Sequence, residues 1–90
     1  MARKRVGVQF FGRVQGVGFR WRCKMMAAET DLTGFAFNES DGTVKAEFQG
    51  EESHINKLLY ELDHDRFIRI EHMDILIMPL KENESGFQVW

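Results

Sequence analysis

The sequence predicts an α+β fold in which two helices cover one face of an antiparallel sheet. Three observations favour this fold. Two amphipathic segments alternate with β-rich segments, turn-forming residues divide the middle of the chain, and 90 residues suffice for one sheet and one layer of helices. Because the chain shows no internal repeat, linker or low-complexity segment, we expect residues 1–90 to form a single domain.

The first two predicted elements are a strand and a helix joined by a glycine-rich loop. Val6 to Phe11 is β-rich, with Gly7 and Gly12 near its ends, which predicts a strand. Between Phe19 and about Thr30, apolar positions recur at spacings of three and four, as on one face of a helix. These positions are Phe19, Cys23, Met26, Ala27 and Thr30. The segment TDLTG closes the helix.

A hairpin and a second helix follow. Ser40, Asp41 and Gly42 form a turn cluster between two alternating runs, which predicts a hairpin. Its period-two positions are Phe35, Phe37, Val44, Ala46 and Phe48. The segment EESHINKLLYELDH predicts a helix because acids occupy its first turn and one side of it is apolar.

The last part of the chain predicts one long strand and one short strand. The run from Phe67 to Met78 is rich in β-branched residues, and its apolar positions change phase midway. We therefore expect a bulge or bend near His72. Pro79 ends the pairing, and Phe87 to Trp90 supplies a short last strand.

The predicted order is strand, helix, strand, strand, helix, strand, followed by the short terminal strand. Because crossover connections are right-handed, this order places both helices on the same face of the sheet. The predicted fold is therefore the βαββαβ ferredoxin-like α/β sandwich.

Cysteine content and hydropathy indicate the compartment. The single cysteine, Cys23, excludes an internal disulfide and favours a reducing compartment. The apolar run near the N-terminus is shorter than a signal peptide needs, and no stretch approaches the roughly 20 apolar residues of a membrane span. We expect a cytoplasmic protein without a membrane partner. Cys23 lies on the apolar face of its helix, which predicts a small buried hydrophobe rather than a nucleophile.

Positive charge is concentrated near the N-terminus, although the net charge is only −2. Residues 1–24 carry seven bases and no acid, whereas the remaining 66 residues carry five bases and fourteen acids. The seven bases are Arg3, Lys4, Arg5, Arg13, Arg20, Arg22 and Lys24. This pattern is typical either of an ordinary surface with segregated charges or of a segment that meets an anion.

The loop sequence GRVQGVGFR, from Gly12 to Arg20, leads into the first helix without a capping residue. Ser, Thr, Asp and Asn are absent from positions 15–19, so the first helical amides lack their usual acceptor. Arg20 adds positive charge where the helix dipole is already positive. Free amides, glycines and a guanidinium together suit a tetrahedral anion such as phosphate. Alternatively, the glycines only form a tight turn, with water on the amides and Arg20 in solvent.

The motifs GRVQGVGFR and TGFAFNESDGTVKAEFQG resemble the acylphosphatase family, and the similarity in element order extends over nearly the whole chain. The resemblance implies a phosphate-binding loop made of Val14, Gln15, Gly16, Val17, Gly18, Phe19 and Arg20. It also implies that Arg20 and Asn38 are the catalytic residues. The chain departs from the family pattern at Phe37, where a polar residue is common, and after the second helix, where DHDRF replaces a Gly-Pro turn.

The resemblance implies hydrolysis of a small-molecule acyl phosphate to carboxylate and inorganic phosphate. Inorganic phosphate is then also expected to inhibit the enzyme. Because a carboxylate leaves without being protonated, the chemistry needs positioning and charge stabilisation rather than a general acid. Asn38 would orient the attacking water. We expect no cofactor and no metal, since His54, His64, His72 and Cys23 show no zinc-ligand spacing. A free-standing monomer is expected.

Other readings of the sequence remain open. The segment TGFAFNES partly imitates the aromatic motif of RNA-recognition domains, but it lacks the basic residue and falls on the second strand rather than the third. A phosphate-binding regulatory domain without turnover is another alternative. Trp21 and Trp90 are expected to be packing residues, with the alternative that one of them borders the substrate cleft.

Overall fold

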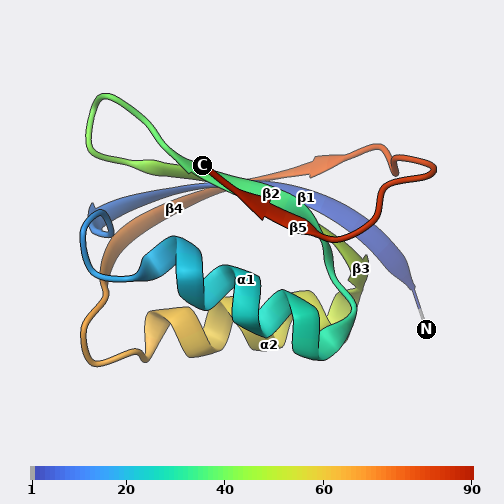
Figure 1. Ribbon diagram of the computed structural model, residues 1–90, viewed down its shortest axis with the longest axis horizontal. Coiled ribbons are helices and arrows are strands. Elements are labelled where there is room, and N and C mark those ends of the chain that lie inside the picture. The colour runs from blue at the N-terminus through green and yellow to red at the C-terminus, as the bar shows by residue number, and fades with distance from the viewer. Residues whose placement is uncertain (1) are drawn as a thin grey trace.

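Five strands form one sheet, and two helices pack on a single face of it (Figure 1). The computed structural model describes residues 2–90, so residue 1 of the predicted domain lies outside the described residues. The elements are β1 (Arg3–Arg13), α1 (Phe19–Thr30), β2 (Thr33–Asn38), β3 (Val44–Glu51), α2 (Glu52–Asp63), β4 (Arg69–Met78) and β5 (Phe87–Val89). The predicted ferredoxin-like sandwich is confirmed. Neither helix of residues 2–90 has the length and apolarity of a membrane span.

The strand order is β4-β1-β3-β2-β5. Four strands pair antiparallel, as predicted, but β5 runs parallel to β2, so the sheet is mixed. The reason is the connection after β4. The chain crosses from one edge of the sheet to the other and returns in the direction of β2 (Figure 1). The prediction of a purely antiparallel sheet was wrong at this edge strand.

The predicted irregularity near His72 is a bulge in β4. Phe11 pairs with His72, and the next residue of β1 pairs with Ile70, which leaves Glu71 without a partner in the register. One extra residue shifts every later side chain to the other face of a strand. The phase change in the apolar pattern therefore has its cause at Glu71.

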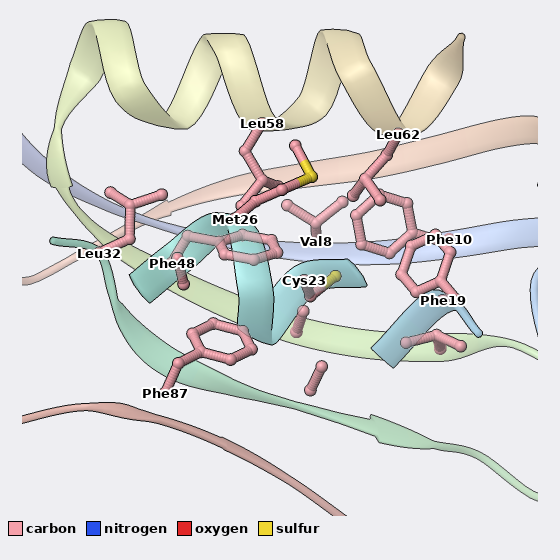
Figure 2. Close-up of a cluster of buried hydrophobic side chains, with 14 of the residues drawn as sticks. Val8, Phe10, Phe19, Cys23, Met26, Leu32, Phe48, Leu58, Leu62 and Phe87 are labelled. Atoms are coloured by element: carbon pink, nitrogen blue, oxygen red, sulfur yellow. The ribbon is translucent and has the colours of Figure 1, made fainter. Parts of the chain in front are cut away.

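Both helices and the sheet contribute to one hydrophobic core (Figure 2). Cys23 and Met26 of α1 and Leu58 of α2 belong to this core, and the helices cover the buried faces of β1 and β3. Cys23 is fully buried, and this burial raises the pKa of its thiol well above the ordinary value. Cys23 is thus the small buried hydrophobe that the sequence predicted.

The aromatic residues of β2 do not join this core. Val44, Ala46 and Phe48 of β3 face the helices, whereas Phe35 and Phe37 lie on the open face of the sheet. Their rings stack with each other and with Trp90, with centroid separations of 5.6 to 6.0 Å. Trp90 therefore packs against other rings, as predicted, but at the surface, where it stays 60% exposed. Alternation along β2 explains the result, because Ala36 occupies the buried side between the two phenylalanines.

The open face also carries a buried arginine. Arg5 is 1% exposed and donates to Glu84 through two nitrogens, at 2.7 and 3.1 Å. It also donates to Glu47 at 2.7 Å and to Gln49 at 3.2 Å. A buried guanidinium is tolerated because these carboxylates and the amide satisfy it. This network fastens the segment between β4 and β5 to the sheet.

Replacing Glu84 with Gln should lower the free energy of unfolding by about 2 kcal/mol at pH 7, because charge-assisted hydrogen bonds from Arg5 are lost. The hydrogen bond from Arg5 holds the pKa of Glu84 below its usual value of 4.5. A lowered folded-state pKa means that the stabilisation is present above pH 4.5 and is lost as the pH falls through the folded-state pKa. Urea unfolding at several pH values between 7 and 3 measures both effects.

Glu82→Gln is the matched control, because Glu82 is exposed and makes no hydrogen bond or ion pair with another described residue. Its stability should follow the wild-type curve. A Glu84→Gln variant with the wild-type pH dependence would show that the Arg5 network does not contribute to acid sensitivity.

Candidate functional site

The loop of residues 14–18 brings the chain from β1 into α1 without a side-chain cap. Gly18 is the N-cap residue, with φ 79°, and no side chain bonds the helix start. The first helical bond runs from the Arg22 amide to the Gly18 carbonyl at 3.0 Å. The amides of residues 19–21 therefore precede the helical hydrogen-bond pattern, and the first turn holds no acid. This helix start has free donors and a positive dipole end.

The loop glycines leave the backbone accessible. Gly16 and Gly18 have φ values of 74° and 79°, which glycine adopts without strain. A Cβ atom at either position would meet no heavy atom within 4 Å, so the space beside the loop is open. A hollow of about 250 Å³, which we call the loop hollow, is lined by Val14, Gly16, Gly18, Phe19, Arg20, Trp21 and Val89. A small anion can reach the backbone amides from this hollow.

The first turn of α1 also carries the positively charged side chain of Arg20. It is half-buried beside the loop hollow and has no hydrogen bond or ion pair with any side chain of residues 2–90. By contrast, Nη2 of Arg22 lies 3.0 Å from Oδ2 of Asp65. One arginine of the turn thus holds the loop after α2, and the other is available to a ligand.

Asn38 ends β2 opposite Val44 of β3. By the alternation of the strand, it lies on the same side of the sheet as Ala36, which faces the helices. Its Oδ1 atom is buried and has no hydrogen-bond partner among residues 2–90. An unsatisfied buried amide oxygen costs free energy, and it needs a donor such as water to satisfy it.

Gln15 joins the loop to the hairpin that carries Asn38. Its Nε2 donates to the carbonyl oxygens of Glu39 at 2.7 Å and Thr43 at 2.9 Å. These two carbonyls flank the turn directly after Asn38, and Figure 1 shows the loop and the hairpin at the same end of the sheet. Two segments that are more than 20 residues apart in sequence are therefore fixed against each other.

The hairpin turn is itself held by Asp41. Oδ1 of Asp41 accepts hydrogen bonds from the hydroxyl of Thr43 at 2.6 Å and from its amide at 3.0 Å. These bonds lower the pKa of Asp41. The turn therefore presents the Thr43 and Glu39 carbonyls to Gln15 in a fixed geometry.

The other loop residues anchor the site. Val14 and Phe19 are buried in the core, and Val17 packs against its edge. Trp21, in contrast, is 62% exposed and borders the loop hollow, which fits the alternative position at the edge of a cleft better than a packing role. Nothing in its local sequence distinguished it from a packing residue, because its exposure depends on which face of α1 meets α2.

A hollow larger than the loop hollow lies elsewhere, on the open face of the sheet. Its volume is about 590 Å³, and neither Asn38 nor any of residues 14–20 lines it. Phe35 and Phe37 border it, which reproduces the outward aromatics of an RNA-recognition sheet. Its charged lining is mixed, with Lys45 beside Glu47 and Asp74, so the face lacks the basic surface that nucleic acid requires.

No three His, Cys, Asp or Glu side chains of residues 2–90 are placed to hold a metal ion. The candidate site consists of the helix start with Arg20, the open loop glycines and the buried, unpartnered amide oxygen of Asn38. Fold and site together define the class: a ferredoxin-like α/β domain with free backbone donors at an uncapped helix N-terminus.

Comparison with known proteins gives the family. The family model for acylphosphatase matches residues 6–89, and the chain belongs to the acylphosphatase family. The acylphosphatase of Clostridium acetobutylicum is 39% identical over 83 residues, which cover 91% of each chain. That of Geobacillus kaustophilus is 38% identical over 87 residues, covering 96% of this chain and 93% of the relative.

Solved structures agree. The crystal structure of acylphosphatase from Bacillus subtilis superposes with a TM-score of 0.87 at 25% identity, covering 96% of this chain and 97% of that chain. Full-length HypF, solved in a phosphate- and nucleotide-bound form, matches with a TM-score of 0.88 and 26% identity, over 99% of this chain but 12% of that chain. The protein is an enzyme with the activity of its family, which acts on small-molecule acyl phosphates.

Proposed function

We propose that the enzyme hydrolyses its substrate by in-line attack of water on phosphorus, without a metal ion. The loop of Val14, Gln15, Gly16, Val17, Gly18, Phe19 and Arg20 binds the phosphoryl group. Arg20 and Asn38 are the catalytic residues. The reaction breaks the bond between phosphorus and the acyl oxygen and releases carboxylate and inorganic phosphate.

The leaving group explains why so few residues suffice. A carboxylic acid has a pKa of about 4, so the carboxylate departs without receiving a proton. No general acid is needed, and phosphoryl transfer reduces to positioning and to stabilising charge on the three equatorial oxygens. The candidate site offers groups for these two tasks.

The helix start and Arg20 stabilise the phosphoryl oxygens. The free amides of residues 19–21 donate hydrogen bonds in the direction of the helix dipole, and the guanidinium forms a charged fork with two oxygens. These donors are in place before the substrate arrives, so they cost little reorganisation in the transition state.

Asn38 positions the attacking water. The water donates one O–H to the buried Oδ1 atom of Asn38. This hydrogen bond directs a lone pair of the water oxygen at phosphorus. An amide is nearly non-basic, so it does not remove the proton. That proton passes to a phosphate oxygen or to solvent as the new bond forms.

The single observation that supports these roles best is the unsatisfied Oδ1 of Asn38, held beside the anion loop through Gln15. A buried acceptor without a partner is rare, and the attacking water supplies the missing donor.

The test is release of carboxylate and phosphate from acetyl phosphate in the presence of a chelator. We expect full turnover with the chelator and competitive inhibition by inorganic phosphate. A strong loss of turnover with the chelator would contradict the metal-free mechanism. Phosphate binding without turnover in the wild-type protein would instead identify a regulatory binding domain.

Gln15→Leu should lower kcat about 10-fold. The substitution removes the hydrogen bonds that hold the loop against the hairpin of Asn38. Small displacements of a group that positions a reactant lower the rate of catalysis. The inhibition constant of phosphate should change less than kcat, since the helix start and Arg20 remain. Steady-state kinetics with acetyl phosphate separate the two effects.

Gln88→Leu is the control for Gln15, because Gln88 is exposed on β5 and has no side-chain hydrogen bond with another described residue. Wild-type kcat in Gln15→Leu would show that the bridge to the hairpin does not position Asn38.

We also propose that the enzyme is a monomer in the cytoplasm. The single buried cysteine fits a reducing compartment. Gel filtration and light scattering test the monomer.

A further inference from the structure

A second hollow borders the loop on the side away from the hairpin. Its volume is about 450 Å³, and we call it the flank hollow. Val17, Gly18 and Trp21 form one wall, and residues 64–67, which connect α2 to β4, form the other. The ion pair between Arg22 and Asp65 joins these two walls. The flank hollow therefore has walls that an ion pair holds together.

Two exposed aromatic side chains face this space. Trp21 is 62% exposed and Phe67 is 68% exposed, and both line the flank hollow. The Arg66 guanidinium lies 5.5 Å from the centre of the Phe67 ring. Exposed aromatic rings offer flat apolar faces on which a planar group of a ligand can stack.

Trp21 also borders the loop hollow, where Arg20 lies. It directly follows Arg20 in the chain, and Gly18 likewise lines both hollows. A ligand whose phosphoryl group binds beside Arg20 can therefore reach the flank hollow past the Trp21 ring.

In-line displacement decides which way the acyl group points. The attacking oxygen and the leaving oxygen lie on opposite sides of phosphorus. Asn38 lies on the hairpin side of the loop, where Gln15 makes its bonds, and the flank hollow lies on the side of the α2–β4 connection. Figure 1 shows the loop between these two segments. Water held by Asn38 thus drives the leaving group towards the flank hollow.

We propose that the flank hollow is the acyl-group subsite and that Trp21 favours acyl phosphates whose acyl part is a flat aromatic ring. This inference rests on the proposed roles of Arg20 and Asn38. The indole offers a planar face for stacking, and Phe67 closes the opposite side of the hollow. A small aliphatic acyl group reaches neither ring face well, so it gains less from the subsite.

The test compares kcat/KM for benzoyl phosphate and acetyl phosphate, and the measured quantity is the ratio of the two. Trp21→Ala should lower this ratio about 5-fold, within the range expected for one lost aromatic pair. Trp21→Phe should restore most of it. Phe67→Ala should lower the ratio in the same direction, which provides a second variant if Trp21→Ala folds poorly.

Trp90→Ala is the matched control, since Trp90 is 60% exposed on the open face of the sheet, outside both hollows. Its ratio should equal that of the wild type. Turnover of both substrates with an unchanged ratio in Trp21→Ala and Phe67→Ala would overturn the subsite and leave the proposed function intact. Turnover of neither substrate by the wild type would overturn both.

Discussion

Replacing Arg20 with Ala should reduce kcat/KM for acetyl phosphate by at least about 10³-fold, the largest loss that we expect from one substitution. The guanidinium is the only charged group of the first turn of α1 that has no partner among residues 2–90. In the proposed mechanism, the guanidinium contacts the phosphoryl group in the ground state, and this interaction strengthens as charge develops on the equatorial oxygens. Both substrate affinity and turnover should therefore fall, and steady-state kinetics with a phosphate-release assay measure them.

Arg20→Lys separates charge from geometry. Lysine keeps the positive charge but loses the planar fork, so we expect it to recover phosphate affinity more than turnover. Arg13→Ala is the control, because Arg13 is an exposed arginine of the same basic segment and should change kcat/KM less than about 3-fold. An Arg20→Ala enzyme with kcat within 10-fold of wild type would disprove the catalytic role of Arg20.

Replacing Asn38 with Ala should lower kcat by about 10² or more while leaving the inhibition constant of inorganic phosphate close to the wild-type value. In the proposed mechanism, the amide orients the water and makes no contact on which phosphate binding depends, so its loss acts on the transition state. The free energy of unfolding should change little, because Oδ1 of Asn38 makes no hydrogen bond in the folded protein and its removal therefore breaks none. Turnover, phosphate inhibition and urea unfolding of the same preparation distinguish these three quantities.

Asn56→Ala is the matched substitution outside the site, on the exposed side of α2. It should retain wild-type turnover. If Asn38→Ala weakened phosphate binding as strongly as it lowered kcat, Asn38 would be a phosphate ligand and the water-orienting role would be wrong.

The order of the elements could be predicted because each carries a local signal. Helical spacing of apolar residues located α1 and α2, and the Ser40 to Gly42 cluster located the hairpin. The phase change in β4 even indicated the bulge, since side chains of a strand alternate with a period of two. Element ends were less certain. The first strand is longer than Val6 to Phe11, because pairing with β3 and β4 extends it to Arg3–Arg13.

The site was predicted in part. The missing cap, the glycines and Arg20 are adjacent in sequence, so the candidate anion loop was visible without a structure. Asn38 had no such local signal. It resembled a turn residue, and only the family motif singled it out. The bridge from Gln15 to the Glu39 and Thr43 carbonyls was not predictable, because side-chain contacts between segments 24 and 28 residues apart depend on how the sheet folds.

The sequence by itself determined the α+β class, the two helices, the hairpin, the bulge and the uncapped glycine loop before α1, because these depend on neighbouring residues through backbone preference and hydrophobic periodicity. The tertiary structure alone decided the parallel pairing of β5, the outward stacking of Phe35 and Phe37, the exposure of Trp21 and the buried, unpartnered oxygen of Asn38. These features depend on which segments meet in space. Burial and hydrogen-bond satisfaction are properties of the packed chain, and no local pattern encodes them.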